Sequence, residues 1–367
     1  MSQLYRQSRM ILGFCSRVLD NMARTFKDRD KLIMIMFFLR TLFLFVFVSQ
    51  PSLAEVLDKR KVCTWDPVGR QGPVMAFFTD LEAIAIPWGL DLEFIPYEDE
   101  NQVAKDLSKG ECDIGIVTAI LSRDFVQFAG TLDAIGGITS EDKLKKTLAT
   151  ITSPKATDLM SDGNYEVVAS LPVGSMYAYV NDKSIDSIDK FRGKKIGILN
   201  GDIQTQMFAE LAGATPFQTS LSEFASHFNE GHIDITFMPA LAYETFELNK
   251  GLGDKGGILD IRLFYGMIQA ISRKSEFSDT FGVQMRRYLY NKLATAIHLI
   301  DNAEASIPKK YWIETSQETK DELEEFYKNI RLTLKVNKKF DSRALSLLWK
   351  IRCQSSPERD ECVKPEQ

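Results

Sequence analysis

The stretch from residue 191 to residue 239, FRGKKIGILNGDIQTQMFAELAGATPFQTSLSEFASHFNEGHIDITFMP, constrains this fold more than any other part of the chain. A short apolar run at 196–199 changes to helical spacing after it, and a second apolar run returns at 233–238. Asp202 and Ser220 are suitable helix N-caps within the stretch. The pattern predicts strand, helix, short strand, helix and strand.

Gly213 and Gly231 are suitable residues to end these two helices. A βαβ unit of this kind forms parallel strands, whose carboxyl ends meet at one edge of a sheet. Ligands of open α/β sheets usually bind beyond that edge. We therefore expect a site beyond residues 200–202 and 238–240, with the rest of the chain bringing a second lobe against it.

The long apolar run at residues 32–49 is interrupted by Arg40. A membrane-spanning helix needs about 20 apolar residues without a central charge, so this run is too short and too interrupted. A secretory signal fits better, with Arg40 as the basic region, 41–48 as the apolar region and 52–54 as the small-residue cleavage site. The sequence predicts cleavage after Ala54 and a periplasmic location.

An uncleaved anchor is the alternative, because Lys31 and the bases before it favour retention in a membrane. Met34 and Met36 would each start an ordinary signal. The residues before them are therefore either a long basic region or an over-extended gene start.

The chain expected after cleavage, residues 55–367, is long enough for two lobes of ordinary size. Without the eight Lys/Arg and three Asp/Glu of residues 1–54, it has 37 basic and 47 acidic residues and a net charge of −10. An acidic chain without a dense basic stripe argues against nucleic acid as a partner.

Four of the five cysteines remain after residue 54, namely Cys63, Cys112, Cys353 and Cys362. An even number in an exported chain indicates disulfides, with three possible pairings. In a right-handed doubly wound sheet, the first and third strands of the first lobe are neighbours. Cys63 and Cys112 would then lie on adjacent strands and bridge if their register matches, and Cys353 and Cys362 would close a tail loop.

The order of the predicted elements indicates that a second lobe is inserted into the first. The expected boundaries are lobe I with the C-terminal helices at 55–165 and 272–367, the core of lobe II at 182–255, and hinge strands at 166–181 and 256–271. Two crossings between lobes are typical of proteins that close around a ligand by a hinge.

Several segments together resemble the DctP-like solute receptors of tripartite ATP-independent periplasmic (TRAP) transporters, among them FRGKKIGI and AGATPFQTSLSEFASHFNEGHIDI. CTWDPVGRQGP, YEVVASLPVGSMYAYVNDKSI, ELNKGLGDKGGI, the KYW at 310–312 and the Cys-containing tail resemble the AdeT-type branch of that family. The resemblance covers nearly the whole chain after residue 54. It implies an α/β, two-lobed type II periplasmic-binding-protein fold with an inserted second lobe, a helical C-terminal region and a small-molecule ligand in the cleft.

One position departs from the family pattern. TRAP receptors typically carry an arginine, in the strand after the Lys-rich turn, that binds the ligand carboxylate through two hydrogen bonds. The resemblance places Gly197 at that position. Arg70, on the loop after the first strand, is the nearest replacement, and it is equally well explained as a solvated loop charge.

Other candidate ligand contacts lie at or just beyond predicted strand ends. The polar candidates are Asp66, Gln71, Thr118, Asn200 and Gln204, with Met238 beside them, and Trp65, Tyr97 and Tyr243 are candidates for an apolar wall. Each polar residue has an alternative as a cap or turn partner, since Asp66 precedes Pro67 and Asp202 suits an N-cap. About half of such a set is expected to touch ligand.

Several more specific motifs occur without the structural context that their usual function requires. GLGDKG at residues 251–256 has the Rossmann glycine spacing, but it follows a helix and precedes a strand, the reverse of what pyrophosphate binding requires. His227 and His232 are expected not to share a helix face, which argues against metal binding, and His298 fits a packed helix face. We expect no cofactor and no metal, and we find no nucleophile elbow or activated cysteine.

Three function classes remain for comparison. An extracytoplasmic receptor for a small polar or amphipathic solute, which delivers it to a TRAP-type permease, explains the signal, the two lobes and the lack of a catalytic set. An accessory role in aminoglycoside efflux is the alternative, although the chain lacks the sustained heptads of periplasmic efflux adaptors. An enzyme on the same fold would need a perturbed acid, base or metal site in the cleft. The sequence favours the receptor.

Overall fold

A computed structural model describes residues 57–363 of the chain. The predicted signal segment at 1–54 lies outside these residues. The strands are β1 Asp58–Trp65, β2 Leu90–Tyr97, β3 Ile114–Thr118, β4 Ser161–Asp162, β5 Tyr165–Val180, β6 Lys195–Leu199, β7 Thr215–Thr219, β8 Ile235–Pro239, β9 Gly257–Leu259, β10 Phe264–Arg273 and β11 Trp312–Ile313.

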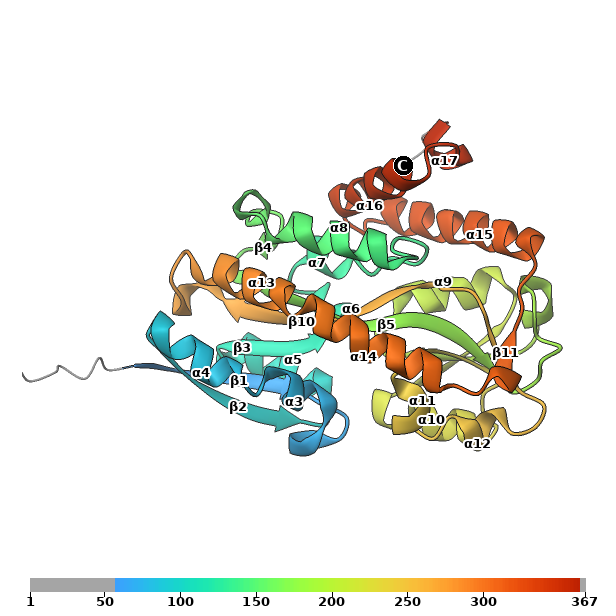
Figure 1. The fold of residues 1–367 in the computed structure, drawn as a ribbon, viewed down its shortest axis with the longest axis horizontal. Helices are drawn as coiled ribbons and strands as arrows, with labels where there is room; N and C mark the ends of the chain where they lie inside the picture. Colours follow the sequence, from blue (N-terminus) through green and yellow to red (C-terminus); the bar gives the residue numbers. More distant parts are fainter. Residues whose placement is uncertain (1–56, 364–367) are drawn as a thin grey trace, which may run out of the picture. The chain divides into compact units, whose positions relative to one another are not determined.

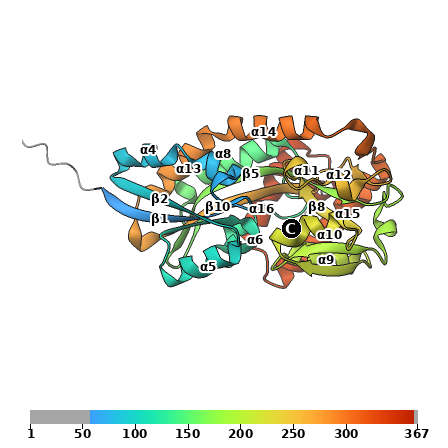
Figure 2. The same ribbon diagram turned by 90° about the horizontal axis from the view of Figure 1, so that it is seen from below.

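Helices lie on both faces of the sheet (Figures 1 and 2). They are α3 Pro73–Phe78, α4 Leu81–Ala85, α5 Glu100–Lys109, α6 Ala119–Ser122, α7 Gln127–Gly130, α8 Glu141–Thr152, α9 Ile203–Leu211, α10 Leu221–Asn229, α11 Ala242–Thr245, α12 Asn249–Leu252, α13 Phe281–Asn291, α14 Leu293–Ser306, α15 Gln317–Val336, α16 Ser342–Ser355 and α17 Asp360–Val363. The chain is therefore mixed α/β with a helical C-terminal region.

The described strands form a single sheet of eleven strands, with the central order β2-β1-β3-β10-β5-β8-β6-β7. β1 pairs in parallel with β2 and β3, and β6 pairs in parallel with β7 and β8. The predicted neighbourhood of the first and third strands, with the second outside the first, is confirmed. This order follows from right-handed crossovers through the intervening helices.

The predicted strand–helix pattern of residues 191–239 is confirmed as β6-α9-β7-α10-β8. Asp202 caps α9 by accepting a hydrogen bond from the Thr205 N–H. Gly213 and Gly231 follow the two helices with φ of +65° and +76°, a backbone conformation that glycine adopts without strain.

Two long antiparallel strands, β5 and β10, cross the middle of the sheet. The sequence predicted two separate runs where the structure has the continuous β5, because Val173–Ser175 contains the turn-forming Gly174. Gly174 pairs with Gly266 of β10, and the pairing register shifts directly after Gly266. β5 pairs with β10 along residues 165–176 and with β8 along 176–180, so it links the two parallel groups of strands.

Both expected disulfides are present. Cys63 of β1 is bonded to Cys112 with a Cα–Cα distance of 5.9 Å, and Cys353 of α16 is bonded to Cys362 of α17 with a Cα–Cα distance of 5.5 Å. Cys112 was expected within the third strand, but that strand begins at Ile114.

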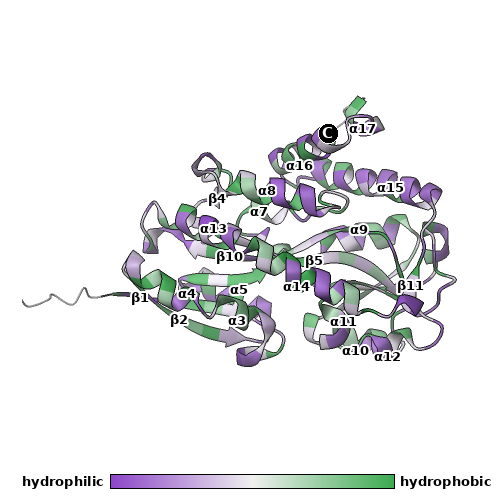
Figure 3. Ribbon diagram, in the orientation of Figure 1, coloured by the Kyte–Doolittle hydropathy of each residue, from purple (hydrophilic) through white to green (hydrophobic). Residues whose placement is uncertain are grey.

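The long C-terminal helix α15 packs against α9. Most of its surface is hydrophilic (Figure 3), while an apolar stripe that includes Leu323, Tyr327, Ile330 and Leu334 is buried. The Phe208 ring of α9 lies 5.0 Å from Phe326 of α15 between ring centroids. The C-terminal region is therefore joined through aromatic packing to the unit of residues 191–239.

Candidate functional site

A cavity of about 340 Å³ lies where the carboxyl ends of the parallel strands meet. The ends of four parallel strands contribute Trp65 of β1, Thr118 of β3, Leu199 of β6 and Met238 of β8. The crossing strands β5 and β10 add Met176 and Met267, and α14 adds Leu299. The position of this cavity agrees with the edge that the sequence predicted.

The wall of the cavity is mostly apolar. Its polar side chains are Thr118, Asp133, Asp202, Thr205 and Thr245. Among residues 57–363, no lysine, arginine or histidine lines it. An apolar wall with a few placed polar groups is typical of small-molecule sites.

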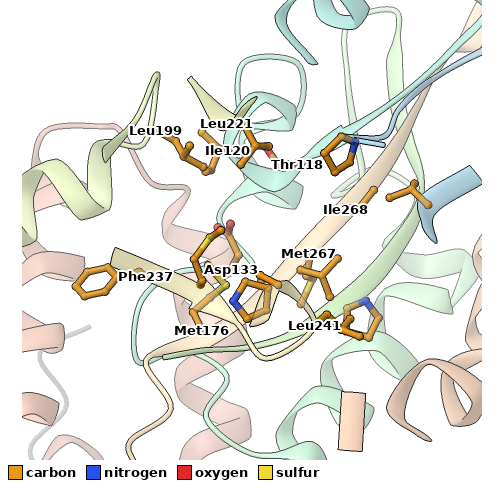
Figure 4. Close-up of a pocket in the computed structure, with 18 of the residues that line it drawn as sticks. Thr118, Ile120, Asp133, Met176, Leu199, Leu221, Phe237, Leu241, Met267 and Ile268 are labelled. Carbon is orange, nitrogen blue, oxygen red and sulfur yellow. The ribbon is translucent and has the colours of Figure 1, made fainter. Parts of the chain in front are cut away.

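Asp133 places a buried carboxylate in this wall, among Ile120, Met176 and Leu199 (Figure 4). The Asp133 side chain is 4% exposed, and its Oδ1 accepts a hydrogen bond of 3.1 Å from Nη2 of Arg123, whose side chain is 6% exposed. Arg123 also donates to the carbonyl of Gly130 from Nε at 3.1 Å and from Nη2 at 2.9 Å. The guanidinium therefore sits behind the wall and not in the cavity.

Asp202 is the second carboxylate of the wall. As the N-cap of α9 it accepts 3.1 Å and 2.6 Å hydrogen bonds from the backbone N–H and the hydroxyl of Thr205. Burial raises the pKa of Asp202, and the Thr205 hydrogen bonds oppose that rise. Burial also raises the pKa of Asp133 to about 6, with Arg123 opposing the rise and the Asp202 charge adding to it.

Two of the predicted ligand contacts, Thr118 and Met238, lie in the cavity wall, as does the predicted wall residue Trp65. Thr118 is held at the end of β3, where its backbone N–H donates to the Glu100 carboxylate at 3.0 Å. These residues stand at strand ends, which is the property that selected them from the sequence.

Asp66, Arg70 and Gln71 lie outside the lining of the cavity. The buried Asp66 carboxylate accepts hydrogen bonds from the backbone N–H groups of Val68, Val74 and Met75, at 2.8–3.0 Å. It thus closes the turn before α3, which is the alternative that the following proline suggested. Arg70 and Gln71 are exposed on a 3₁₀ turn.

Tyr97, Asn200, Gln204 and Tyr243 also lie outside the lining. The Tyr97 hydroxyl donates to Asp106 at 3.0 Å, and Tyr243 is buried in a second apolar cluster. Asn200 lines a separate cavity of about 300 Å³ beside the start of α5.

Gln204 supports the site from behind. Its Oε1 accepts a 2.9 Å hydrogen bond from the Ile135 N–H, and its Nε2 donates to the Asp133 carbonyl at 3.4 Å. The oxygen and the nitrogen of this amide therefore both form hydrogen bonds with the segment that carries Asp133.

Gly197, at the position of the family arginine, lines the cavity together with Phe224. A Cβ atom at Gly197 would lie 2.6 Å from Cδ1 of Ile233 and 3.0 Å from Cε2 of Phe224. These distances are shorter than van der Waals contact, so the neighbours fill the space that a side chain would need. Packing around Gly197 therefore leaves no space for a larger residue at this position.

The sequence analysis did not select Asp133, although it is the buried carboxylate of the wall. Asp133 lies between α7 and α8, outside any predicted strand end. The pattern contained no signal for it, because its neighbours Arg123 and Asp202 approach it only through the fold.

His227 lies on α10 and His232 beyond its end, so the two do not share a helix face, although their Nδ1 atoms lie 3.2 Å apart. His232 follows the end of α10, where the chain turns back at Gly231. No group of three or more His, Cys, Asp or Glu suited to a metal ion occurs within residues 57–363. GLGDKG begins with the last two residues of α12 and ends directly before β9, in the helix-to-strand order expected.

Comparisons with known proteins agree on the family and the fold. The family model for solute-binding protein AdeT 1/2 matches residues 87–366. The probable solute-binding protein AdeT1 of Acinetobacter baumannii is 32% identical over 299 residues, covering 82% of this chain and 98% of that protein. AdeT2 of the same organism is 23% identical, covering 64% of this chain and 98% of that protein.

Two solved structures show the fold. A TRAP periplasmic solute-binding protein from Desulfovibrio salexigens, with bound orotic acid, matches with a TM-score of 0.67 and 10% identity, covering 82% of this chain and 99% of that one. The ectoine-binding protein of the TeaABC TRAP transporter of Halomonas elongata matches with a TM-score of 0.66 and 13% identity, covering 81% and 98%.

These likenesses confirm the predicted fold class, and the family is one of binding proteins and not of enzymes. No helix within residues 57–363 is long and apolar enough to cross a membrane. The chain belongs to the AdeT 1/2 family of solute-binding proteins.

Proposed function

We propose that this protein is an extracytoplasmic receptor that captures a small amphipathic solute in the 340 Å³ cavity and delivers it to a TRAP-type permease. The observation that carries this proposal is an apolar cavity at the carboxyl ends of parallel strands, where α/β sheets bind ligands. Thr118 and Met238 are the proposed contacts that the sequence also selected.

We propose further that residues 182–255 act as an inserted lobe that closes on the remainder, 55–165 and 272–367. The hinge would lie in 166–181 and 256–271, which contain most of β5 and β10. The register shift beside Gly174 and Gly266 supports this assignment, because the sheet pairing is interrupted there between the two parallel groups.

Export is supported by the two disulfides within residues 57–363, because such bonds persist in oxidising compartments. We propose cleavage after Ala54 and a periplasmic location, as for the TRAP receptors that share the fold. The Desulfovibrio salexigens protein has bound orotic acid, and the Halomonas elongata protein is an ectoine-binding protein, so small organic solutes are the relevant class.

An accessory role in aminoglycoside efflux has less support. An aminoglycoside carries many amino and hydroxyl groups, and each of them needs a polar partner when it is removed from water. The wall described above offers five polar side chains among many apolar ones.

Native mass spectrometry of the protein purified from the periplasm without dialysis tests the proposal. We expect one small molecule per chain, released on denaturation. Leu241, 37% exposed and part of the cavity wall, provides the blocking variant Leu241→Trp. Leu211, 49% exposed on α9 and outside the lining, provides the control Leu211→Trp.

The bound mass should disappear in Leu241→Trp and persist in Leu211→Trp. A wild-type protein that carries no ligand, or a ligand retained in both variants, would contradict the proposal.

A further inference from the structure

We propose that the cavity selects an amphipathic amine, with an apolar body in the wall and a single ammonium group against the Asp133 carboxylate. The inference rests on the proposed function, because it names the class of solute that the same cavity takes.

The apolar body follows from the composition of the wall. Met176, Leu199, Phe237 and Met267 surround the cavity in Figure 4, and the polar side chains are few. Transfer of apolar surface into such a wall contributes roughly 25 cal/mol per Å² buried. A solute that is polar over its whole surface would lose its hydrogen bonds to water without replacement.

The sign of the head group follows from the charges around the cavity. Two carboxylates, Asp133 and Asp202, line it, and no basic side chain among residues 57–363 does so. Arg123 is the buried guanidinium that faces them from behind, so two buried carboxyl groups share one positively charged neighbour. A ligand ammonium would bring a second positive charge to these carboxyl groups. A ligand carboxylate would instead place another acidic group beside them.

The Asp133 carboxylate also offers an acceptor to the cavity. Arg123 donates to Oδ1, and within residues 57–363 no side chain donates a hydrogen bond to Oδ2. Asp133 is 3% exposed, yet it lines the cavity, where Figure 4 shows its oxygens among apolar neighbours. A ligand N–H would form a charge-assisted hydrogen bond with this carboxylate.

The end of β6 adds no positive charge to the wall. Gly197 lines the cavity there, and Ile233 and Phe224 occupy the space that a side chain at this position would need. The end of β6 therefore presents an aromatic ring to the cavity and no cation.

The pH dependence has a definite sign. The groups that face Asp133 are Arg123 from the end of α6, Asp202 from the start of α9, and the Gln204 amide at its backbone. Burial places the Asp133 pKa at about 6. Above that pH the carboxylate is charged and attracts an ammonium, so amine binding should strengthen as pH rises through 6 and weaken below it.

Three probes with one apolar body test the head group, namely 4-phenylbutylamine, 4-phenylbutanol and 4-phenylbutyrate. Isothermal titration calorimetry of the ligand-free wild-type protein at pH 7.5 should rank them amine, alcohol, carboxylate. We expect at least about a tenfold preference for the amine over the carboxylate, the factor that one charge-assisted hydrogen bond supplies.

Asp133→Asn should reduce that preference to less than about threefold, since the amide keeps the shape and removes the charge. Asp124→Asn is the matched control, because Asp124 is an exposed aspartate between α6 and α7 and lies outside the lining. The amine stays protonated between pH 5 and 8, so its affinity for the wild type in this range reports the titration of the cavity carboxyls, Asp133 and Asp202. That series needs no variant, and it remains informative if Asp133→Asn fails to fold.

Equal affinity for the three probes, tighter binding of the carboxylate, absence of binding by all three, or a preference that Asp133→Asn retains would overturn the amine assignment. These outcomes are distinguishable from failure of the proposed function. If native mass spectrometry finds a small molecule that is not an amine and that is lost in Leu241→Trp, the result supports the receptor function and contradicts the amine assignment.

Discussion

Gly197 determines what the cavity wall holds at the end of β6. Its missing side chain leaves room for the ring of Phe224, so an aromatic surface lines the cavity at this position. At the same scale, Asp66 and Gln204 have the residue types of ligand contacts but are used by the protein on its own backbone. A polar residue near a strand end is thus available to a ligand only where the protein's own hydrogen-bond donors do not already occupy it.

Gly197→Ala should lower the free energy of unfolding by about 1–3 kcal/mol, because the added methyl overpacks the contact with Ile233. Ile233→Val removes the Cδ1 atom that the methyl would meet, and by itself costs about 0.5–1.5 kcal/mol. In the double variant the loss should be smaller than the sum of the two single losses. Urea unfolding of the four proteins measures this coupling, and strictly additive losses would contradict the packing account.

Among the elements, β1 and α17 are tied to their neighbours by disulfides. Cys63–Cys112 spans 49 residues, from β1 across β2 and α5 to the residue pair before β3. Cys353–Cys362 spans 9 residues and joins the last two helices. The first bond fixes the strands whose ends carry Trp65 and Thr118, so it supports one side of the cavity.

Opening the longer loop should cost more stability than opening the shorter one. In the chain-entropy model, loss of the Cys63–Cys112 bond costs about 4 kcal/mol and loss of Cys353–Cys362 about 3 kcal/mol. Chemical denaturation of the paired Cys→Ala variants measures the two losses. A thiol assay on the oxidised protein without residues 1–54 should detect no free thiol, and four titratable thiols would contradict both bonds.

Across the molecule, α9 connects the parallel group β8-β6-β7 to the C-terminal helices. Phe208 is fully buried, with ring-centroid distances of 5.0 Å to Phe237 of β8 and 5.0 Å to Phe326 of α15. Gln204 adds hydrogen bonds from the same helix to the segment of Asp133. The proposed lobes are therefore coupled through one face of α9.

Phe208→Ala should destabilise the protein by about 3–5 kcal/mol, because it leaves a cavity between the sheet and α15. Phe208→Leu is the control that keeps most of the volume and should cost less. We expect thermal unfolding of Phe208→Ala to shift to lower temperature as one transition. An unchanged midpoint would show that α9 does not couple these parts.

Local elements were predictable from the sequence, since their signals lie within a few residues of one another. The apolar periodicity of 191–239 and the cap at Asp202 define β6-α9-β7-α10-β8 without reference to the rest of the chain. The order β2-β1-β3 follows from the handedness of crossovers. The continuous β5 was not predictable, because Gly174 is a turn signal in isolation and finds its partner Gly266 only in the sheet.

The sequence by itself determined the fold class, the edge of the sheet where the cavity lies and the membership of a solute-binding family, and it indicated the two cysteine pairs among three possible pairings. Only the tertiary structure decided the chemistry of the cavity, because its wall is assembled from residues far apart in the chain. The segment that carries Asp133 meets α9 through the hydrogen bond between Ile135 and Gln204, which are 69 residues apart in the chain. Patterns among residues that are neighbours in the sequence do not predict such a contact, because it depends on how the helices and strands pack against one another.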